Sequence, residues 1–443
     1  MTIKNRQEPF LLFLGDIFAF FAALWLTLVI RYLEVPSEAM WEAHLLPFSV
    51  IIGISFIVFV IAGLYGKHTT NIRTKLPSTI FSAQVTNAIL ALLVFYFIPF
   101  FGITPKTNLF IYLILSTGLI FAWRLAGGKF FEIGKKQKIV LIGKKAEAEE
   151  IAAEVQANER YGLVVSNIFD IDIVSEDEIN AVFNSALHTK DCIVVADSDN
   201  PKVASALSKN YDLILSTLIF FDIHWLYEQM FDRVPVNSVN YLWLIDYNKS
   251  SIALYDIVKR IMDLVIALPF FLITLPFFPL AALLIKLEDR GQILITQERV
   301  GKRGKKVYLY KFRTMNRSDE GVWLGESENK VTKVGYFLRK SRIDELPQLL
   351  NVIKGDISLI GPRPDIVGLG NKLVEAIPYY MTRYIVPPGL SGWAQIQQKP
   401  PQSIEENKLR FSYDLFYVKN RSIFLDLVIG LRTIKTLLSR TGM

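Results

Sequence analysis

Four long apolar runs lie within residues 1–130 and constrain the fold of this chain more than any other feature. They cover Phe10 to Ile30, Leu45 to Leu64, Ser78 to Phe101 and Leu109 to Trp123. A helix needs about 20 apolar residues to cross the hydrocarbon of a bilayer, and the fourth run is somewhat shorter. The sequence therefore predicts four transmembrane helices. Asp16 lies inside the first run, where a carboxylate is costly, so it has either a functional role or a role in helix packing.

Basic residues are distributed unequally between the loops on the two sides of these runs. One side carries Lys4, Arg6, Lys67, Arg73, Lys75, Arg124, Lys129, Lys135, Lys136 and Lys138. The opposite side carries only Arg31 and Lys106. Because cytoplasmic loops are enriched in Lys and Arg, the amino terminus and everything after about residue 124 are predicted to be cytoplasmic. The first run has no small-residue cleavage site before it, so we expect a retained anchor and not a signal peptide.

Composition agrees with a membrane protein that has soluble parts, because 51% of the 443 residues are hydrophobic. The net charge is +7, and the basic residues flank apolar runs, which fits anionic lipid headgroups and phosphorylated ligands better than nucleic acid. The single cysteine, Cys192, excludes an intramolecular disulfide and is predicted to be a buried strand thiol. The four histidines, His44, His68, His188 and His224, show no metal-ligand spacing.

Residues 135–245 alternate short apolar strands with polar helices. The strands are "KIVLIG", "YGLVVSNIFD" and "DCIVVAD", and the helices are "AEAEEIAAEVQ", 176–187 and 202–210. This alternation predicts a small, Rossmann-like parallel α/β domain. Its first turn, "GKKAEAEE", has Gly143 but lacks the later glycines that admit a pyrophosphate, so a structural or regulatory domain is favoured over a dinucleotide-binding one.

A second kind of apolar segment runs from Ile261 to Ile285 and contains three prolines. It is long enough to cross a bilayer, but both of its flanks are basic, which a crossing helix does not satisfy. Proline removes a backbone donor and clashes with the preceding turn, and Pro276 lies near the middle. We predict a re-entrant helix at about 257–286 that bends at Pro276, with the freed carbonyls satisfied by side chains such as Thr274. The alternative is a kinked fifth span. The flanks are Lys259 and Arg260 before the segment and Lys286, Arg290, Arg299, Lys302, Arg303, Lys305 and Lys306 after it.

Three dense motifs occupy the last part of the chain: "YKFRTM", "LRKSRIDELPQLLNVIKGDISLIGPRP" and "PPGLSGWAQI". Within the middle motif, "DELPQLLNVIKG" predicts a helix with Asp344 at its cap, Pro347 in its first turn and Gly355 just past its end. Asp344 and Glu345 would then stand at the positive end of the helix dipole. A cap and a first-turn acid would also explain both carboxylates without any chemistry.

The neighbours of these two acids suggest a substrate with phosphates. Guanidinium groups hold phosphate oxygens bidentately, so a dense basic cluster suits a diphosphate. Adjacent helical residues point about 100° apart, so one acid is free to attack phosphorus while the other holds a divalent cation. The basic residues of this cluster are Lys311, Arg313, Arg339, Lys340, Arg342 and Arg363.

These motifs, preceded by "KRIMD" and the proline-broken run, closely resemble the bacterial sugar transferases that act as polyprenyl-phosphate phosphoglycosyl transferases. The resemblance covers about Ile257 to Leu438 and includes Arg260 and Asp263 of "KRIMD" as membrane-topology residues beside Pro276. The four apolar runs and the α/β domain resemble the long form of the family, the undecaprenyl-phosphate glucose or galactose phosphotransferases. This implies a catalytic domain at 250–443, α-rich and anchored by a re-entrant membrane helix, in a multi-pass protein of the bacterial inner membrane.

The resemblance implies a two-step reaction between a UDP-sugar and polyprenyl (undecaprenyl) phosphate. An aspartate attacks the β-phosphorus of the UDP-sugar, UMP leaves, and polyprenyl phosphate then takes the phosphosugar from the enzyme. By this resemblance Asp344 is the nucleophile and Glu345 binds Mg²⁺. Lys311 and Arg339 match positions associated with substrate phosphates, and Arg363 matches one associated with the nucleotide.

Three further positions follow from the same resemblance or depart from it. Asp414 in "YDLFYV" and Asp426 in "FLDLVIG" match recurrent acids, which serve either the site or the stability of the fold. After "GWAQ" many relatives read "VNGR", but this chain reads "IQQKPPQ". Lys399 supplies a charge there without the planar fork of an arginine.

Three functional classes are therefore compared. The favoured one is a membrane enzyme that starts a glycan on a lipid carrier and forms part of an exopolysaccharide, capsule or O-antigen pathway, with the bilayer as partner and a homo-oligomer as an option. A membrane-bound nucleotide-sugar epimerase or dehydratase would require the missing glycine-rich turn. A non-catalytic membrane scaffold would not need the acid pair and the basic cluster together.

Overall fold

The structure is a computed structural model, and it describes residues 8–65, 72–97, 106–132, 136–158, 161–187, 192–210, 219–239, 253–315 and 331–438. The chain forms two compact units, Met1–Phe231 and Asp232–Met443. His68 and His188, two of the four histidines without metal-ligand spacing, lie outside the described residues.

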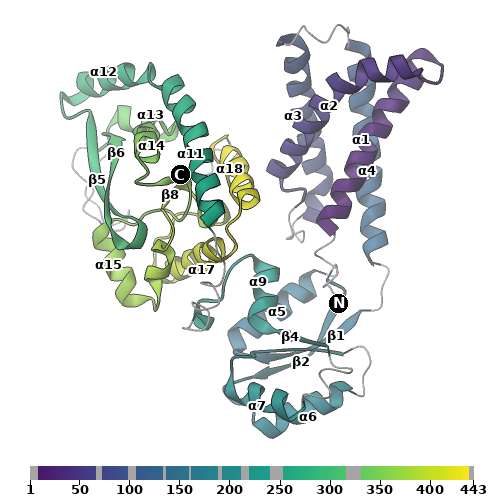
Figure 1. The fold of residues 1–443 in the computed structure, drawn as a ribbon, viewed down its shortest axis with the longest axis vertical. Helices are drawn as coiled ribbons and strands as arrows, with labels where there is room; N and C mark the ends of the chain where they lie inside the picture. Colours follow the sequence, from purple (N-terminus) through teal and green to yellow (C-terminus); the bar gives the residue numbers. More distant parts are fainter. Residues whose placement is uncertain are drawn as a thin grey trace. The chain divides into compact units, whose positions relative to one another are not determined.

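Four long helices open the first unit: α1 (Glu8–Tyr32), α2 (Glu38–Ala62), α3 (Ile72–Phe97) and α4 (Lys106–Glu132) (Figure 1). All four are long and apolar enough to cross a membrane, as predicted. Phe20, Phe48 and Phe59 are buried between them, while their outer faces expose large apolar side chains. These helices pack through aromatic contacts and leave the apolar surface that lipid requires.

A buried ion pair lies among these helices. Arg124 on α4 bonds Asp16 on α1 through two nitrogens and donates to the carbonyl of Leu64 at 2.8 Å. The hydroxyl of Tyr65 donates to Asp16 at 2.7 Å. Asp16 therefore joins helices, and Arg124, which the sequence counted among the loop charges, is buried as its partner.

The α/β domain of the first unit has a four-stranded sheet in the order β2-β1-β3-β4. The strands are β1 (Gln137–Gly143), β2 (Leu163–Asp170), β3 (Cys192–Ala196) and β4 (Ile219–Asp222), and all of their pairings are parallel. Helices α5 (Lys145–Ala157) and α9 (Ile223–Phe231) cover one face, and α6 (Glu176–Leu187) and α7 (Pro201–Lys209) cover the other (Figure 1). The predicted parallel α/β sheet is confirmed. Cys192 begins β3 and is only half-buried.

The second unit contains the region 250–443, where the catalytic domain is predicted, and most of its helices and strands are short. Helices α11 (Ala253–Thr274) and α12 (Phe277–Asp289) are followed by an antiparallel hairpin, β5 (Leu294–Val300) and β6 (Lys306–Phe312), and β7 (Ser358–Ile360) pairs in parallel with β8 (Gly389–Ser391). The remaining helices are η4 (Val236–Ser238), η5 (Lys302–Gly304), α13 (Lys333–Lys340), η6 (Ile343–Gln348), α14 (Leu349–Lys354), α15 (Val367–Ala376), η7 (Tyr380–Tyr384), α16 (Trp393–Gln397), α17 (Ile404–Asn420) and α18 (Ile423–Leu438). Val234 and Val239 pack in the core of this unit.

Helices α11 and α12 meet at a break and are bent by 55°. The break falls at Leu275 and Pro276, and the hydroxyl of Thr274 donates to the carbonyls of Phe270 at 2.9 Å and Phe271 at 3.1 Å. The predicted position of the bend agrees with this geometry. The carbonyl that Pro276 frees is that of Leu272, so the bonds of Thr274 to Phe270 and Phe271 do not confirm its predicted role. The bent pair has the composition of either a broken span or a re-entrant segment, so the re-entrant topology stays a prediction.

The first half of α11 is fixed to the rest of the second unit by its polar side chains. Arg260 donates to the carbonyls of Val352 at 2.6 Å and Ile353 at 2.7 Å, at the carboxyl end of α14. Asp263, which is buried, accepts from the backbone N–H of Leu359 at 3.1 Å. These two residues of the predicted topology set are therefore also structural links between α11 and the segment that carries the acid pair.

The structure places Asp344 differently from the predicted helix cap. Arg342 is the cap, in the left-handed region with φ 57°, and Asp344 lies inside the 3₁₀ helix η6. This 3₁₀ helix ends at Gln348, just after Pro347, and α14 begins at Leu349. The prediction was wrong because the chain turns at Arg342 before the helix begins. The predicted end is confirmed, since Gly355 is the left-handed cap of α14 with φ 93°.

Candidate active site

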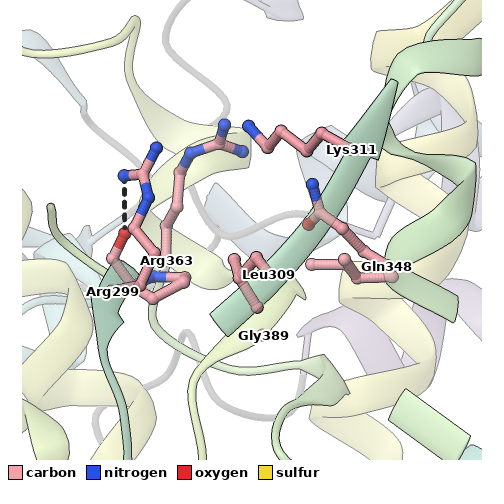
Figure 2. A pocket seen from close by; sticks show the side chains of 8 residues that line it. Arg299, Leu309, Lys311, Gln348, Arg363 and Gly389 are labelled. Carbon is pink, nitrogen blue, oxygen red and sulfur yellow. Dashed lines mark hydrogen bonds between the residues drawn. The ribbon is translucent and has the colours of Figure 1, made fainter. Parts of the chain in front are cut away.

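The candidate active site surrounds a pocket of about 230 Å³, part of which is open to solvent. Strand β6 brings Lys311, η6 brings Gln348, and the loop after β7 brings Arg363 (Figure 2). The head groups of Lys311 and Arg363 point toward one another in this view. The other lining residues are Arg299, Leu309, Pro364, Gly389 and Leu390. The pocket therefore combines three cationic side chains with a small apolar floor.

Glu345 joins the cations of this pocket. One of its carboxylate oxygens lies 3.1 Å from Arg363 and 3.7 Å from Lys311, and the other lies 3.7 Å from Arg342. Burial raises the pKa of Glu345, but the charges of Arg363, Lys311 and Arg342 outweigh it and lower this pKa to about 2. Glu345 is therefore a fixed negative charge at neutral pH.

Asp344 has the opposite surroundings, although it is the next residue. It is 8% exposed, and its Oδ1 has no hydrogen-bond partner among the described residues. Burial and the charge of Glu345 raise the pKa of Asp344 to about 6, against the lowering influence of Lys311, Arg339 and Arg342. A buried carboxylate oxygen without a partner is costly in a fold, and such costs concentrate where a group must react or bind.

The same environment lowers the pKa of Lys311. Its burial, with the nearby charges of Arg363 and Arg299, lowers the pKa of Lys311 to about 8 even though Glu345 opposes the change. Gln348 also lines the pocket, and its buried Nε2 has no partner among the described residues. An unsatisfied donor and a cation that releases its proton near pH 8 both suit an anionic ligand.

The remaining predicted basic residues lie around this centre. The Nε of Arg339 donates to the hydroxyl of Thr314 at 2.9 Å, and the Nε of Arg313 donates to the carbonyl of Met315 at 3.0 Å. Arg339 acts on the charge of Asp344, so the structure brings it to the acid pair.

A network of buried charges supports the loop that carries Arg363. Its backbone carbonyl accepts from Arg383 at 2.9 Å and from Arg410 at 2.6 Å. Arg299 donates to the next carbonyl, that of Pro364, at 3.1 Å. Asp365 receives Arg383, Arg410, Tyr380 and Tyr384. This arginine network (Asp365, Arg383, Arg410 and Asp414) holds the loop in place and was not predicted, because its members are far apart in the sequence.

The two recurrent acids of the carboxyl-terminal helices are buried structural partners. Asp414 accepts from Arg383 at 2.7 Å within the arginine network, and Asp426 accepts from Lys259 at 2.9 Å and Tyr417 at 2.9 Å. Neither acid lines the pocket. Lys399 is exposed after α16 and does not line it either. Their predicted contact with substrate stays a prediction, and Arg299 and Gln348 are pocket residues that the sequence did not single out for the site.

The site was compared with known proteins. Residues 254–440 match the family described as bacterial sugar transferase. The chain is 42% identical over 195 residues to UDP-N-acetylgalactosamine-undecaprenyl-phosphate N-acetylgalactosaminephosphotransferase of Aeromonas hydrophila. These residues cover 43% of this chain and 45% of that relative. It is 39% identical over 189 residues to UDP-glucose:undecaprenyl-phosphate glucose-1-phosphate transferase of Caulobacter vibrioides, covering 42% of this chain and 71% of the relative.

A protein of the same name in Klebsiella pneumoniae is 28% identical over 353 residues, which cover 75% of this chain and 76% of that protein. The chain spans less than half of the Aeromonas relative and about 71% of the Caulobacter one. The acid pair interacts with cations that line the pocket, and together with these similarities it indicates a transferase that handles phosphates. The chain belongs to the bacterial sugar transferase family and is an enzyme of the phosphotransferase class.

Proposed function

We propose that this protein transfers a sugar-1-phosphate from a UDP-sugar to undecaprenyl phosphate through a covalent intermediate on Asp344. The observation that carries the proposal is Oδ1 of this buried aspartate, which has no partner among the described residues and feels the charge of the pocket residue Lys311. The names of the relatives supply the two substrates, a UDP-sugar and undecaprenyl phosphate. Both observations support a role in which the protein begins a polysaccharide, such as an exopolysaccharide, a capsule or an O-antigen.

In the first step the carboxylate of Asp344 attacks the β-phosphorus of the UDP-sugar. A bond forms between Oδ1 and phosphorus, and the bond from phosphorus to the oxygen of UMP breaks, so UMP leaves with that electron pair. Lys311 and Arg363 lie where they would neutralise the phosphate oxygens as charge shifts to UMP. A pKa of about 6 leaves Asp344 mostly ionised at neutral pH, while its burial keeps it poorly solvated and reactive.

In the second step an oxygen of undecaprenyl phosphate attacks the same phosphorus. The bond between phosphorus and Oδ1 breaks, Asp344 recovers its carboxylate, and the product is a lipid diphosphate sugar. Because Arg339 and Arg342 act on the charge of Asp344, they stabilise the returning carboxylate.

Mg²⁺ fits the donors of this site. The ionised carboxylate of Glu345 offers the hard oxygen ligand that this ion prefers, and Glu345 would hold the ion in exchange for part of its contact with Arg363. When bound, the ion supplies positive charge that offsets repulsion between a carboxylate and a diphosphate.

The bent pair α11 and α12 supports a site held at the membrane surface. Large apolar side chains are exposed along α11 and α12, among them Ile261, Val265, Leu272, Leu280 and Leu283. A re-entrant insertion would bury this surface in lipid and leave both flanks of the segment on the cytoplasmic side of a bacterial inner membrane. UDP-sugars in the cytoplasm and a lipid phosphate in the bilayer would then reach the same pocket.

The proposed chemistry is tested with purified, detergent-solubilised enzyme. UMP release and a phosphosugar adduct on the intact chain are measured across a panel of UDP-glucose, UDP-galactose and their N-acetylated relatives. The wild type should release UMP and carry the adduct on Asp344, and Asp344→Asn should do neither. Asp177→Asn, an exposed acid on α6, serves as the matched control. UMP release by Asp344→Asn at the wild-type rate would exclude the nucleophile, and no divalent-dependent UMP release from any sugar would favour a scaffold.

The proposed topology has its own test. A cysteine placed just beyond Lys286, in a Cys192→Ser background, should resist an impermeant thiol reagent applied to the outside of intact cells. Labelling from outside would show that the segment crosses. In the same assay, a cysteine at the exposed Val35, between α1 and α2, should label from outside and so serves as the positive control.

A further inference from the structure

A second cluster of titratable side chains lies in the α/β domain, apart from the catalytic chemistry. Asp197 and Asp199 follow β3, Asp222 ends β4, and His224 lies in the first turn of α9. Glu147 joins them from α5, the helix that follows β1. In a parallel sheet ordered β2-β1-β3-β4 the strand order reverses between β1 and β3, and the crevice beyond the carboxyl ends of those strands is where such sheets bind ligands.

The geometry of this cluster is that of an open ligand set. One ligand atom each from Asp197, Asp199 and His224 lie within 4.8 Å of one another. The Nδ1 of His224 is 4.0 Å from Oδ1 of Asp197 and 4.0 Å from Oδ1 of Asp222. These separations are too long for hydrogen bonds. Metal bonds of about 2.1 Å in a tetrahedron separate ligand atoms by about 3.4 Å. Asp197 and His224, at 4.0 Å, and the exposed Asp199 would therefore all draw closer around a bound ion.

Glu147 provides an independent observation at the other nitrogen of the same ring. Its side chain is 7% exposed, and neither of its carboxylate oxygens has a hydrogen-bond partner among the described residues. Its Oε2 lies 3.6 Å from Nε2 of His224. A carboxylate behind the second nitrogen of a histidine is the usual way in which proteins orient a metal-binding imidazole.

We propose that Asp197, Asp199 and His224 form a binding site for a divalent first-row metal ion of the zinc type, with Glu147 as the residue that positions His224. One imidazole with carboxylates suits such an ion better than Mg²⁺ or Ca²⁺, which take oxygen ligands. The acidic rim also opposes a pyrophosphate at this edge of the sheet. His224 shows no metal-ligand spacing in the sequence, because Asp197 and Asp199 follow a different strand from the one that precedes His224.

The bound ion would tie the end of β3 to the start of α9. Asp197 and Asp199 lie on the first of these segments and His224 on the second, and Glu147 adds α5 through the imidazole. A ligand that binds only the folded state stabilises it, so the α/β domain should unfold at a higher temperature with metal bound.

The site is tested by zinc binding to the full-length protein after chelator treatment. Asp344→Asn and Glu345→Gln are present in every sample, so the catalytic acids contribute no ligands. Competition with a chromophoric chelator should give one zinc ion per chain and a higher unfolding temperature. His224→Ala should abolish both, and Glu147→Gln should weaken binding by about 10- to 100-fold.

Two controls keep the outcome decisive. Asp177→Asn and Cys192→Ser should bind zinc as the parent does, which excludes general surface acidity and the lone thiol. Asp199→Asn changes an exposed side chain, so it tests the ligand set without disturbing the core. If the imidazole is simply protonated and paired with the acids, zinc will not bind in the micromolar range, or will bind equally to His224→Ala and Asp199→Asn. Either result overturns the proposal.

Discussion

Two clusters of buried charge lie close together in the second unit, and they differ in how completely their polar atoms are paired. In the arginine network, Asp365 receives Arg383, Arg410 and two tyrosine hydroxyls. In the acid-pair site (Asp344, Glu345, Lys311 and Arg363), Oδ1 of Asp344 has no partner among the described residues. Both clusters are made of carboxylates and cations, so residue type alone does not separate them.

The pKa values of the two central aspartates express this difference. Burial acts to raise the pKa of Asp365, but the charges of Arg383 and Arg410 and the tyrosine hydroxyls hold it well below its usual range. Burial and Glu345 raise the pKa of Asp344 to about 6. A fully paired cluster stabilises one conformation, whereas an incompletely paired one retains the capacity to bind or react.

The largest expected contrast comes from Asp344→Asn. The rate of UMP release should fall by about a thousandfold or more, because the attacking group is gone. Its raised pKa means that the ionised carboxylate destabilises the fold above pH 6, so the amide should increase the free energy of unfolding at neutral pH by up to about 2 kcal/mol. Thermal unfolding and UMP release measure the two effects, and lower stability would show that Asp344 is a structural acid.

The reverse contrast is expected for Asp365→Asn. Without Asp365, the two buried arginines Arg383 and Arg410 share Asp414 as their only remaining carboxylate among the described residues, which should cost about 3 to 5 kcal/mol of stability. Any enzyme that folds should keep the adduct on Asp344, with a raised KM because Arg363 is held less firmly. Thermal unfolding and a KM-against-kcat comparison check this, and wild-type stability would show that the network has no structural role.

Acid should affect the two clusters in opposite directions. The pKa of Asp365 is lower when folded, so its contribution is complete above the unfolded value of about 4 and is lost as the pH falls below it. Asp344 has the raised value, so its contribution is present below about pH 4 and is lost as the pH rises through 6. The free energy of unfolding, measured from pH 3 to 7, should depend less on pH at the acid end in Asp365→Asn. In Asp344→Asn it should depend less on pH between about pH 4 and 6.

The smallest effect concerns Lys311, whose pKa of about 8 places its charge change at the edge of the working range. The ammonium is lost as the pH rises through 8, so kcat/KM for a UDP-sugar should fall there by about tenfold. Lys311→Arg keeps its charge and should lose this alkaline fall while reducing activity overall. If kcat/KM of Lys311→Arg still fell above pH 8 as in the wild type, the fall would be due to another titrating group.

Local patterns in the sequence were enough for the apolar helices, the parallel sheet and the break at Pro276. They depend on hydropathy, strand alternation and proline chemistry, which act over a few residues. The cap at Asp344 was predicted wrongly, because a left-handed residue at Arg342 starts a 3₁₀ helix that propensity does not foresee. The acid pair and Lys311, Arg339 and Arg363 were found from their motifs.

The support of the site depends on contacts that no local pattern contains. Arg383 and Arg410 reach the carbonyl of Arg363 from 20 and 47 residues further along the chain. For Asp414 and Asp426 the resemblance left open a role in the site or in the stability of the fold, and the structure buries each of them against a cation. A motif identifies which residues matter, and only the fold distinguishes support from contact with a ligand.

The bond from Arg260 to the carboxyl end of α14 gives the bent membrane helix a second consequence. Asp344 lies one short 3₁₀ helix before α14, so the attacking oxygen is linked through α14 and Arg260 to a helix whose outer face is apolar. In the proposed re-entrant topology, the depth at which lipid holds that helix would set the height of the carboxylate above the hydrocarbon. The acyl-chain length of the bilayer would then change the distance between the proposed nucleophile and the phosphate of the lipid carrier. Turnover in vesicles with increasing bilayer thickness should therefore pass through an optimum.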